Sequence, residues 1–155
     1  DSGQYNTTFL GDVAIDEVKA NGAGAFNEFT CSTGTTPYLL VDDTLSDGDS
    51  TYLYSDELGA KQSVALENMT STPDEIFAVI PYAVSKKANI GSSAFNLGIV
   101  VNGTSYIIED DSKQNNSTYT VHRQVFEVNP ETDLSFDVDV LNSTETYVQI
   151  VSDYD

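Results

Sequence analysis

Residues 95–108 read Phe-Asn-Leu-Gly-Ile-Val-Val-Asn-Gly-Thr-Ser-Tyr-Ile-Ile, and this stretch decides the fold class. It holds two runs rich in β-branched and aromatic residues, 95–101 and 104–108, separated only by Asn102 and Gly103. An Asn-Gly pair between two such runs is the strongest short-range hairpin signal, because both central residues of a type I′ turn need a positive φ. The stretch therefore predicts an antiparallel β-hairpin.

A second hairpin is predicted near the C-terminus. Apolar and polar residues alternate from Leu134 to Val140, the pattern of a half-buried strand. A polar turn at 142–145 then leads into Thr146–Val151, which is rich in β-branched and aromatic residues. Residues 117–128, between the hairpins, form a longer strand candidate. Further candidates recur at the spacing of roughly 8 to 12 residues that is typical of a sandwich or barrel. They are Tyr5–Leu10, Asp12–Ile15, Tyr38–Val41, Thr51–Tyr54 and Ser63–Glu67.

One segment favours a helix. Thr72-Pro-Asp-Glu75 offers an N-cap hydroxyl, a proline at the first helical position and a carboxylate that reaches back to the cap amide. Pro81 limits this helix to residues 72–80, and a strand over Ile76–Val84 is the alternative. We predict an all-β fold, a single antiparallel β-sandwich of about seven to ten strands, Ig-like or jelly-roll-like. Residues 1–10 form an N-terminal tail and residues 11–155 the sandwich domain.

The net charge excludes one large class of function. The 155 residues include 25 Asp and Glu but only 6 Lys and Arg, which gives a formal net charge of -19 at pH 7. Phosphate recognition needs clustered Lys and Arg, so nucleic-acid binding is excluded. No apolar run approaches the roughly 18 residues of a membrane helix, so we predict no membrane span. In high salt, screening removes most of the self-repulsion of such an acidic chain.

Six Asn-x-Ser/Thr sequons indicate a secreted glycoprotein with N-linked glycans, although chance is the alternative in a chain this rich in Asn, Ser and Thr. They begin at Asn6, Asn68, Asn102, Asn115, Asn116 and Asn142. The chain starts at Asp1 without Met, which fits either removal of a signal segment or a shortened chain. Cys31 is the single cysteine, so no disulfide forms within the chain. We expect an extracellular location.

The residues favour a protein that is not an enzyme. His122 is the single histidine, and alternation places it with Thr120 and Gln124 on the face opposite Val121 and Val125, where we expect it to be solvated. No nucleophile elbow, zinc motif or phosphate-binding loop occurs. A secreted polysaccharide hydrolase is the weaker alternative.

Such a hydrolase would need two suitably spaced carboxylates. Asp137 and Asp139 would lie on the same face of the predicted strand, roughly 7 Å apart, in the range of an inverting pair. Carboxylates near Asp42–Asp49 offer a second choice. Any Asp-x-Asp strand produces this spacing, so the pattern carries little weight.

Two acidic segments are candidates for binding Ca²⁺, which prefers several oxygen ligands from flexible loops. Their carboxylates belong to Asp42, Asp43, Asp47 and Asp49, and to Glu109, Asp110 and Asp111. Neither segment matches the EF-hand template, and two solvated acidic turns are the alternative. A cation would relieve the mutual repulsion within each segment.

A cysteine-poor, sequon-rich, acidic and β-rich chain resembles secreted archaeal surface-filament subunits of the donor-strand type, which include threads, bundling pili and cannulae. The resemblance implies a sandwich that lacks one strand, filled by the N-terminal tail of the next copy in a homopolymer. Here the donor strand would be the tail, where Tyr5, Thr7 and Phe9 alternate with polar residues. The long apolar helix of type IV pilins and archaellins does not occur in these 155 residues, so either the chain is not such a pilin or the helix has been cut away. An S-layer or adhesin module, or the soluble domain of a pilin or archaellum component, is the alternative.

Overall fold

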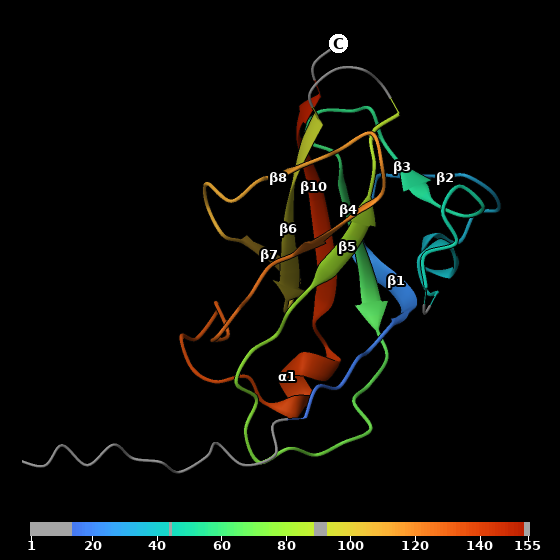
Figure 1. Ribbon diagram of the computed structural model, residues 1–155. Helices are drawn as coiled ribbons and strands as arrows, with labels where there is room; N and C mark the ends of the chain where they lie inside the picture. Colours follow the sequence, from blue (N-terminus) through green and yellow to red (C-terminus); the bar gives the residue numbers. More distant parts are fainter. Residues whose placement is uncertain (1–13, 44, 89–92, 154–155) are drawn as a thin grey trace, which may run out of the picture.

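The computed structural model describes residues 14–43, 45–88 and 93–153, and strands dominate this part of the chain (Figure 1). Besides a 3₁₀ helix, η1 (Pro37–Leu40), and an α-helix, α1 (Val138–Asn142), it contains ten strands. The strands are β1 (Ala20–Asn27), β2 (Thr30–Cys31), β3 (Leu53–Tyr54), β4 (Lys61–Leu66), β5 (Tyr82–Ser85), β6 (Ser93–Val101), β7 (Thr104–Ile107), β8 (Lys113–Gln114), β9 (Thr120–Arg123) and β10 (Glu145–Asp153).

The largest unit is a six-stranded antiparallel sheet with the order β1-β4-β10-β6-β7, in which β8 also pairs with β6. At its centre, Tyr147 of β10 lies opposite Ser63 of β4 on one side and Gly98 of β6 on the other. The predicted hairpin of β6 and β7 is confirmed, with φ of 50° at Asn102 and 78° at Gly103. Both values fit the positive φ that a type I′ turn requires.

A two-stranded antiparallel ribbon, β5 and β9, lies over one face of this sheet (Figure 1). Ala83 of β5 packs against a buried cluster that includes Phe95, Leu97 and Ile150. On β9, the His122 ring meets the Phe95 ring edge to face, with 5.1 Å between the centroids. The all-β antiparallel prediction is therefore confirmed, whereas the two full sheets of a sandwich are not shown.

A second buried cluster extends the core towards the end of the sheet where α1 lies. Ile99 and Val101 of β6 meet Phe126 and Phe136, which come from the irregular segment after β9. This segment is held by an isolated bridge between Val79 and Phe126, whose backbone groups exchange two hydrogen bonds of 2.9 Å. Apolar residues outside regular strands thus continue the layer that covers the sheet.

The strand predicted from Leu134 to Val140 is wrong: Leu134 and Phe136 make only isolated bridges, and β10 pairs with β4 and β6 rather than in a hairpin with this segment. Phe136 makes a bridge to Ile76, but α1 begins at Val138 because the Asp137 carboxylate accepts a hydrogen bond of 2.8 Å from the Val140 amide. Asp137 is an N-cap and Asp139 lies in the first turn, so the two carboxylates do not share a strand face. The strand geometry from which the hydrolase spacing was derived is therefore not present.

The helix predicted near residues 72–80 is wrong as well. Ile76 and Val79 instead form isolated bridges to Phe136 and Phe126, and Pro81 precedes β5. Packing of these two side chains against the core overrides the favourable capping sequence.

The N-terminal half departs from the predicted strands in several places. Residues 38–40 belong to η1 rather than to a strand, and only Leu53–Tyr54 of the candidate 51–54 is extended. The Ser63–Glu67 candidate is largely confirmed as β4, whereas the Gly- and Ala-rich β1 carries no predicted strand. Residues 14–15 lie outside any strand. The tail strand Tyr5–Leu10 lies outside the described residues.

No helix in the described ranges is long and apolar enough to cross a membrane.

Candidate functional site

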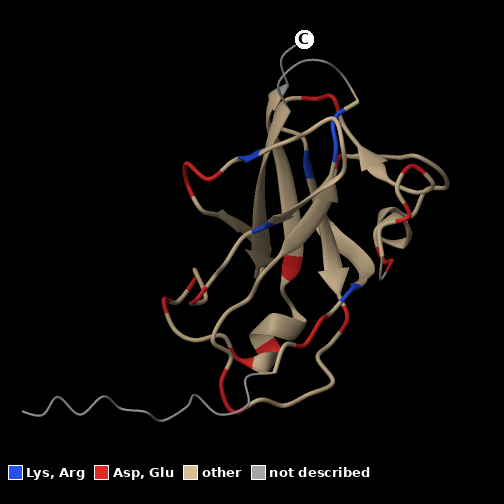
Figure 2. Ribbon diagram, viewed as in Figure 1, with Lys and Arg blue, Asp and Glu red and all other residues tan. Residues whose placement is uncertain are grey.

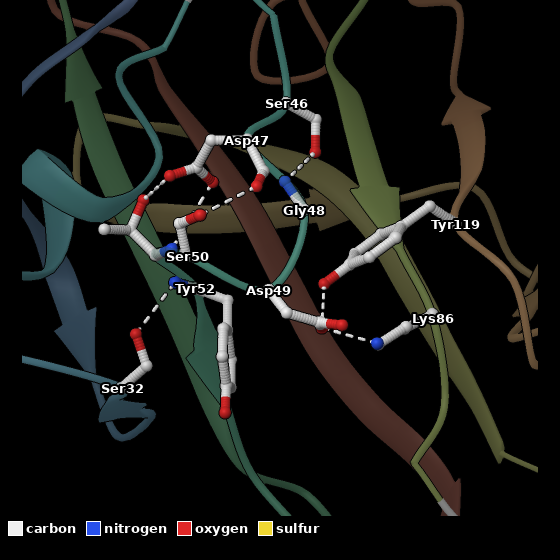
Figure 3. Close-up of polar contacts among 10 residues, drawn as sticks. Ser32, Ser46, Asp47, Gly48, Asp49, Ser50, Tyr52, Lys86 and Tyr119 are labelled. Carbon is white, nitrogen blue, oxygen red and sulfur yellow. Dashed lines mark hydrogen bonds and ion pairs between the residues drawn. The ribbon is translucent and has the colours of Figure 1, made fainter.

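The acidic loop that carries Asp47 and Asp49 is organised by its own side chains (Figure 3). The Asp47 carboxylate accepts a hydrogen bond of 2.8 Å from the Thr51 hydroxyl, and its backbone oxygen accepts one of 3.1 Å from the Ser50 hydroxyl. Gly48 has a φ of 70°, which favours glycine at this turn. Asp47 therefore serves mainly to close the loop.

Asp49 joins this loop to the two-stranded ribbon (Figure 3). Its carboxylate forms an ion pair with Lys86, which follows β5, and accepts a hydrogen bond of 2.7 Å from the hydroxyl of Tyr119, which precedes β9. The Lys86 ammonium also lies 4.7 Å from the centroid of the Tyr119 ring. We call these three residues the Asp49 latch.

The Asp49 latch shifts the ionisation of its members. Hydrogen bonds from Lys86 and then Tyr119 hold the pKa of Asp49 below its usual value. The hydrogen bond to Asp49 raises the pKa of Lys86. Desolvation, followed by the hydrogen bond to Asp49, raises the pKa of Tyr119. All three shifts favour the charge states that keep the loop attached at neutral pH.

The second acidic segment, Glu109–Asp111, is also partly paired. The Lys113 ammonium lies 2.9 Å from the Asp111 carboxylate and lowers the pKa of Asp111 through this hydrogen bond. Asp110 has a φ of 59°, the left-handed conformation that Asp tolerates better than most residues. The segment is a turn in which one carboxylate already has a cationic partner.

No group of three or more His, Cys, Asp or Glu side chains gathers into a possible metal site within the described ranges. Neither acidic segment therefore forms such a group, alone or with the other, among the described residues. A Ca²⁺ site at either segment would need further ligands, such as water or carboxylates from another copy. Calcium binding therefore stays a prediction.

The expected solvated position of His122 is wrong. The side chains of Thr120, His122 and Gln124 turn towards the large sheet, whereas Val121 and Val125 are exposed. Burial, and then the charge of Lys113, lowers the pKa of His122, so the ring is neutral at pH 7. Its Nε2 atom and the Oε1 atom of Gln124 are buried without a hydrogen-bond partner.

Three of the described sequons begin at an exposed asparagine: Asn68, Asn102 and Asn116. The amide nitrogen of Asn102 donates to the Glu131 carboxylate over 2.6 Å, and that of Asn116 donates to the Thr120 hydroxyl over 3.2 Å. Both contacts lie at the surface, so neither buries its asparagine.

Two other sequons begin at an asparagine that is half-buried. The amide nitrogen of Asn115 donates to Ser93 over 3.1 Å, and its oxygen accepts from Ser85 over 2.5 Å. Asn142 lies at the end of α1, where its oxygen accepts from the Met69 amide over 2.8 Å. These two side chains are therefore part of the structure. Asn6 and the predicted donor residues Tyr5, Thr7 and Phe9 lie outside the described residues.

Three sequons meet at one end of the large sheet. Glu145 at the start of β10 pairs with both Ala65 and Val100, so the residues just beyond these positions lie close to one another. Asn68 follows β4 and Asn102 follows β6 at that end, where α1 with Asn142 also lies (Figure 1). Sequence separation had hidden this arrangement.

In comparisons with protein families, with curated proteins and with solved structures, nothing matches this chain.

Proposed function

We propose that this chain is a structural subunit of an extracellular filament, in which the N-terminal tail of one copy completes the β-structure of the next. The proposal rests on the unequal number of strands in the two layers. The large sheet has six strands, whereas the ribbon over it has two, β5 and β9. Neither of these two pairs with a further strand in the described part of the chain. Free strand edges are templates for pairing with another chain.

The tail has the composition of a donor strand. Tyr5, Thr7 and Phe9 alternate with polar residues, so an extended tail presents one apolar face and one polar face. Asn6 belongs to the polar face, which leaves its sequon free for a glycan. Burial of Tyr5 and Phe9 would contribute on the order of 2–3 kcal/mol each before ordering costs.

Head-to-tail strand donation also accounts for a filament. The donor and acceptor surfaces differ, so the contact is heterologous and need not close into a ring. Each added copy presents a fresh acceptor, and the polymer grows. The finished second layer, with its added strand, would approach the sandwich that the sequence pattern predicts.

Deletion of residues 1–10 tests the proposal. The truncated chain should remain folded and soluble but form no filaments by electron microscopy. Adding the free peptide of residues 1–10 should raise its Tm, because the peptide takes the place of the donated strand. The control is the same peptide with Tyr5→Asn and Phe9→Asn, which keeps length and charge.

Filaments formed by the truncated chain, or equal effects of the two peptides, would remove the tail from the mechanism. An intact chain that stays monomeric at high concentration in salt and calcium would favour an S-layer or adhesin module instead.

A further inference from the structure

The two-stranded ribbon turns polar side chains inward and its larger apolar side chains outward. A layer whose outer face is exposed to water usually shows the reverse. The inner face of the ribbon, towards the large sheet, carries the polar side chains of Ser85, Thr120, His122 and Gln124. Two atoms of that face, in His122 and Gln124, are buried without a hydrogen-bond partner. The outer face carries the larger apolar side chains.

We call this outer face the ribbon face. Tyr82 and Val84 of β5 pair with Arg123 and Val121 of β9, so all four side chains point away from the sheet. The Val79–Phe126 bridge is buried against the core, so the residues next to it, Ile80 and Val125, continue the outer row. The five apolar residues of the ribbon face are between 37% and 50% exposed: Ile80, Tyr82, Val84, Val121 and Val125.

The charge of the ribbon face also sets it apart. Arg123 is its one charged member, and no Asp or Glu occurs in β5 or β9, in a chain with 25 acidic residues. Figure 2 shows acidic residues in the surrounding loops and at the end of the molecule near α1, but none on these two strands. Contiguous apolar surface of this kind marks an interaction site. A matching partner is apolar on one face and acidic rather than basic.

The N-terminal segment has these properties in its sequence, and a described residue that follows it lies beside the ribbon face. The Tyr82 hydroxyl donates a hydrogen bond of 2.7 Å to the Glu17 carboxylate, which places Glu17 beside the ribbon face. Residues 1–13, which precede it, contain Tyr5 and Phe9 on one alternating face, two carboxylates and no Lys or Arg. Extended, 13 residues reach about 45 Å, whereas a four-residue strand is about 13 Å long. This length is sufficient to reach another copy.

We propose that residues 5–13 of a second copy add as a strand along the free edge of β9, with Tyr5 and Phe9 on the outer side, where they pack beside the apolar side chains of the ribbon face. This inference rests on the proposed function and assigns its acceptor surface. It explains why apolar residues point outward on β5 and β9, since the outward side chains of the added strand pack against them. Arg123 supplies the positive charge for an acidic tail.

Disulfide trapping tests the assignment in a Cys31→Ser background. One preparation carries Phe9→Cys, the other Val121→Cys, and the two are mixed and oxidised. We expect a covalent dimer at a rate at least tenfold above that of a matched mixture of Phe9→Cys with Leu134→Cys, because Leu134 is exposed elsewhere. Equal rates in the two mixtures would overturn the assignment. So would a double variant, Phe9→Cys with Val121→Cys, that closes its disulfide within single chains, because the tail would then cover its own ribbon.

An assembly assay separates this inference from the proposed function. Val121→Lys with Val125→Lys places two charges on the ribbon face at exposed positions, so the monomer should keep its Tm, and filament yield should fall at least tenfold. Leu134→Lys is the control and should assemble normally. If removal of residues 1–10 leaves assembly intact, the proposed function fails. If assembly needs the tail but tolerates both lysines, and no selective dimer is trapped, the proposed function stands and only the assignment of the ribbon face as the acceptor surface is wrong.

Discussion

Among single residues, the Asp49 latch contributes to stability in a way that depends on pH, and its pKa shifts give the direction of this dependence. Hydrogen bonds from Lys86 and then Tyr119 lower the pKa of Asp49 below its usual value of 3.8. A carboxyl whose pKa is lower in the folded state than in the unfolded state stabilises the folded state at pH values above the unfolded-state pKa. This stabilisation is lost as the pH falls through the folded-state pKa. The contribution should therefore be complete at neutral pH and be lost progressively below pH 3.8.

We predict that Asp49→Asn lowers Tm slightly at pH 7 and that the difference from the natural chain vanishes in strong acid. The effect should be small because the pair is exposed, and it should weaken further in high salt. Thermal melts across pH and salt check both trends. Asp43→Asn is the control, because it removes a carboxylate from the same loop and leaves the Asp49 latch in place. A difference that persists in acid would mean that the substitution disturbs the loop by a route other than charge.

The environment of each asparagine predicts which sequons carry glycan. Attachment of a glycan requires an amide that projects from the surface, and Asn68, Asn102 and Asn116 are exposed. Asn115 uses both ends of its amide in hydrogen bonds to serines, and Asn142 holds the Met69 amide. Mass spectrometry of glycopeptides from the native protein should find sugar on the first three and none on the other two. Glycan on Asn115 would contradict the prediction directly.

At the scale of elements, the β6–β7 pairing depends on one position without a side chain. A Cβ built on Gly98 would lie 2.1 Å from the carbonyl oxygen of Tyr106, which is backbone and has no room to move without breaking the hairpin. Gly98→Ala should therefore cost about 3 kcal/mol or more in the free energy of unfolding.

The matched control is Gly22→Ala, where the new Cβ would meet Ala65 at 3.3 Å and should cost much less. Chemical denaturation compares the two variants. Similar losses would show that β6 and β7 shift apart easily.

Elements were predictable where the signal is local. Asn102-Gly103 fixes the β6–β7 hairpin through the turn itself, and the apolar run of 146–151 falls within β10. The alternation from Leu134 to Val140 failed as a strand signal because the Asp137 carboxylate caps a helix that begins at the next residue. β1 was missed because Gly and Ala lack strand propensity, and its pairing with β4 is non-local.

The inner and outer faces of β9 were assigned the wrong way round for a related reason. Alternation shows that His122 and Val121 lie on opposite faces, but it does not show which face meets the core. The usual rule places the apolar face inside, and here the polar face is inside. This reversal, which sequence reasoning had no means to detect, supports the acceptor surface proposed above.

At the scale of the whole molecule, the formal charge of -19 predicts how stability depends on salt. Even if each of the six Lys and Arg neutralised one carboxylate, 19 of the 25 would keep their charge without a partner. Their repulsion is larger in the compact state than in the unfolded chain. Raising the salt from 0.1 M to 1 M shortens the Debye length from about 10 Å to about 3 Å, so the repulsion is screened.

We therefore expect Tm to rise by about 5 °C over this range, with similar gains from NaCl and from tetramethylammonium chloride, because screening does not depend on the cation. A specific Ca²⁺ site would behave differently, since ligand binding stabilises in proportion to RT ln(1 + [L]/Kd) and appears at low concentration. Calcium added below 1 mM in a constant 1 M NaCl background should leave the Tm of the monomer unchanged, because the described residues hold no cluster of three carboxylates. A saturable rise in Tm under those conditions, lost in Asp47→Asn or Asp111→Asn, would establish the metal site that the acidic segments predict.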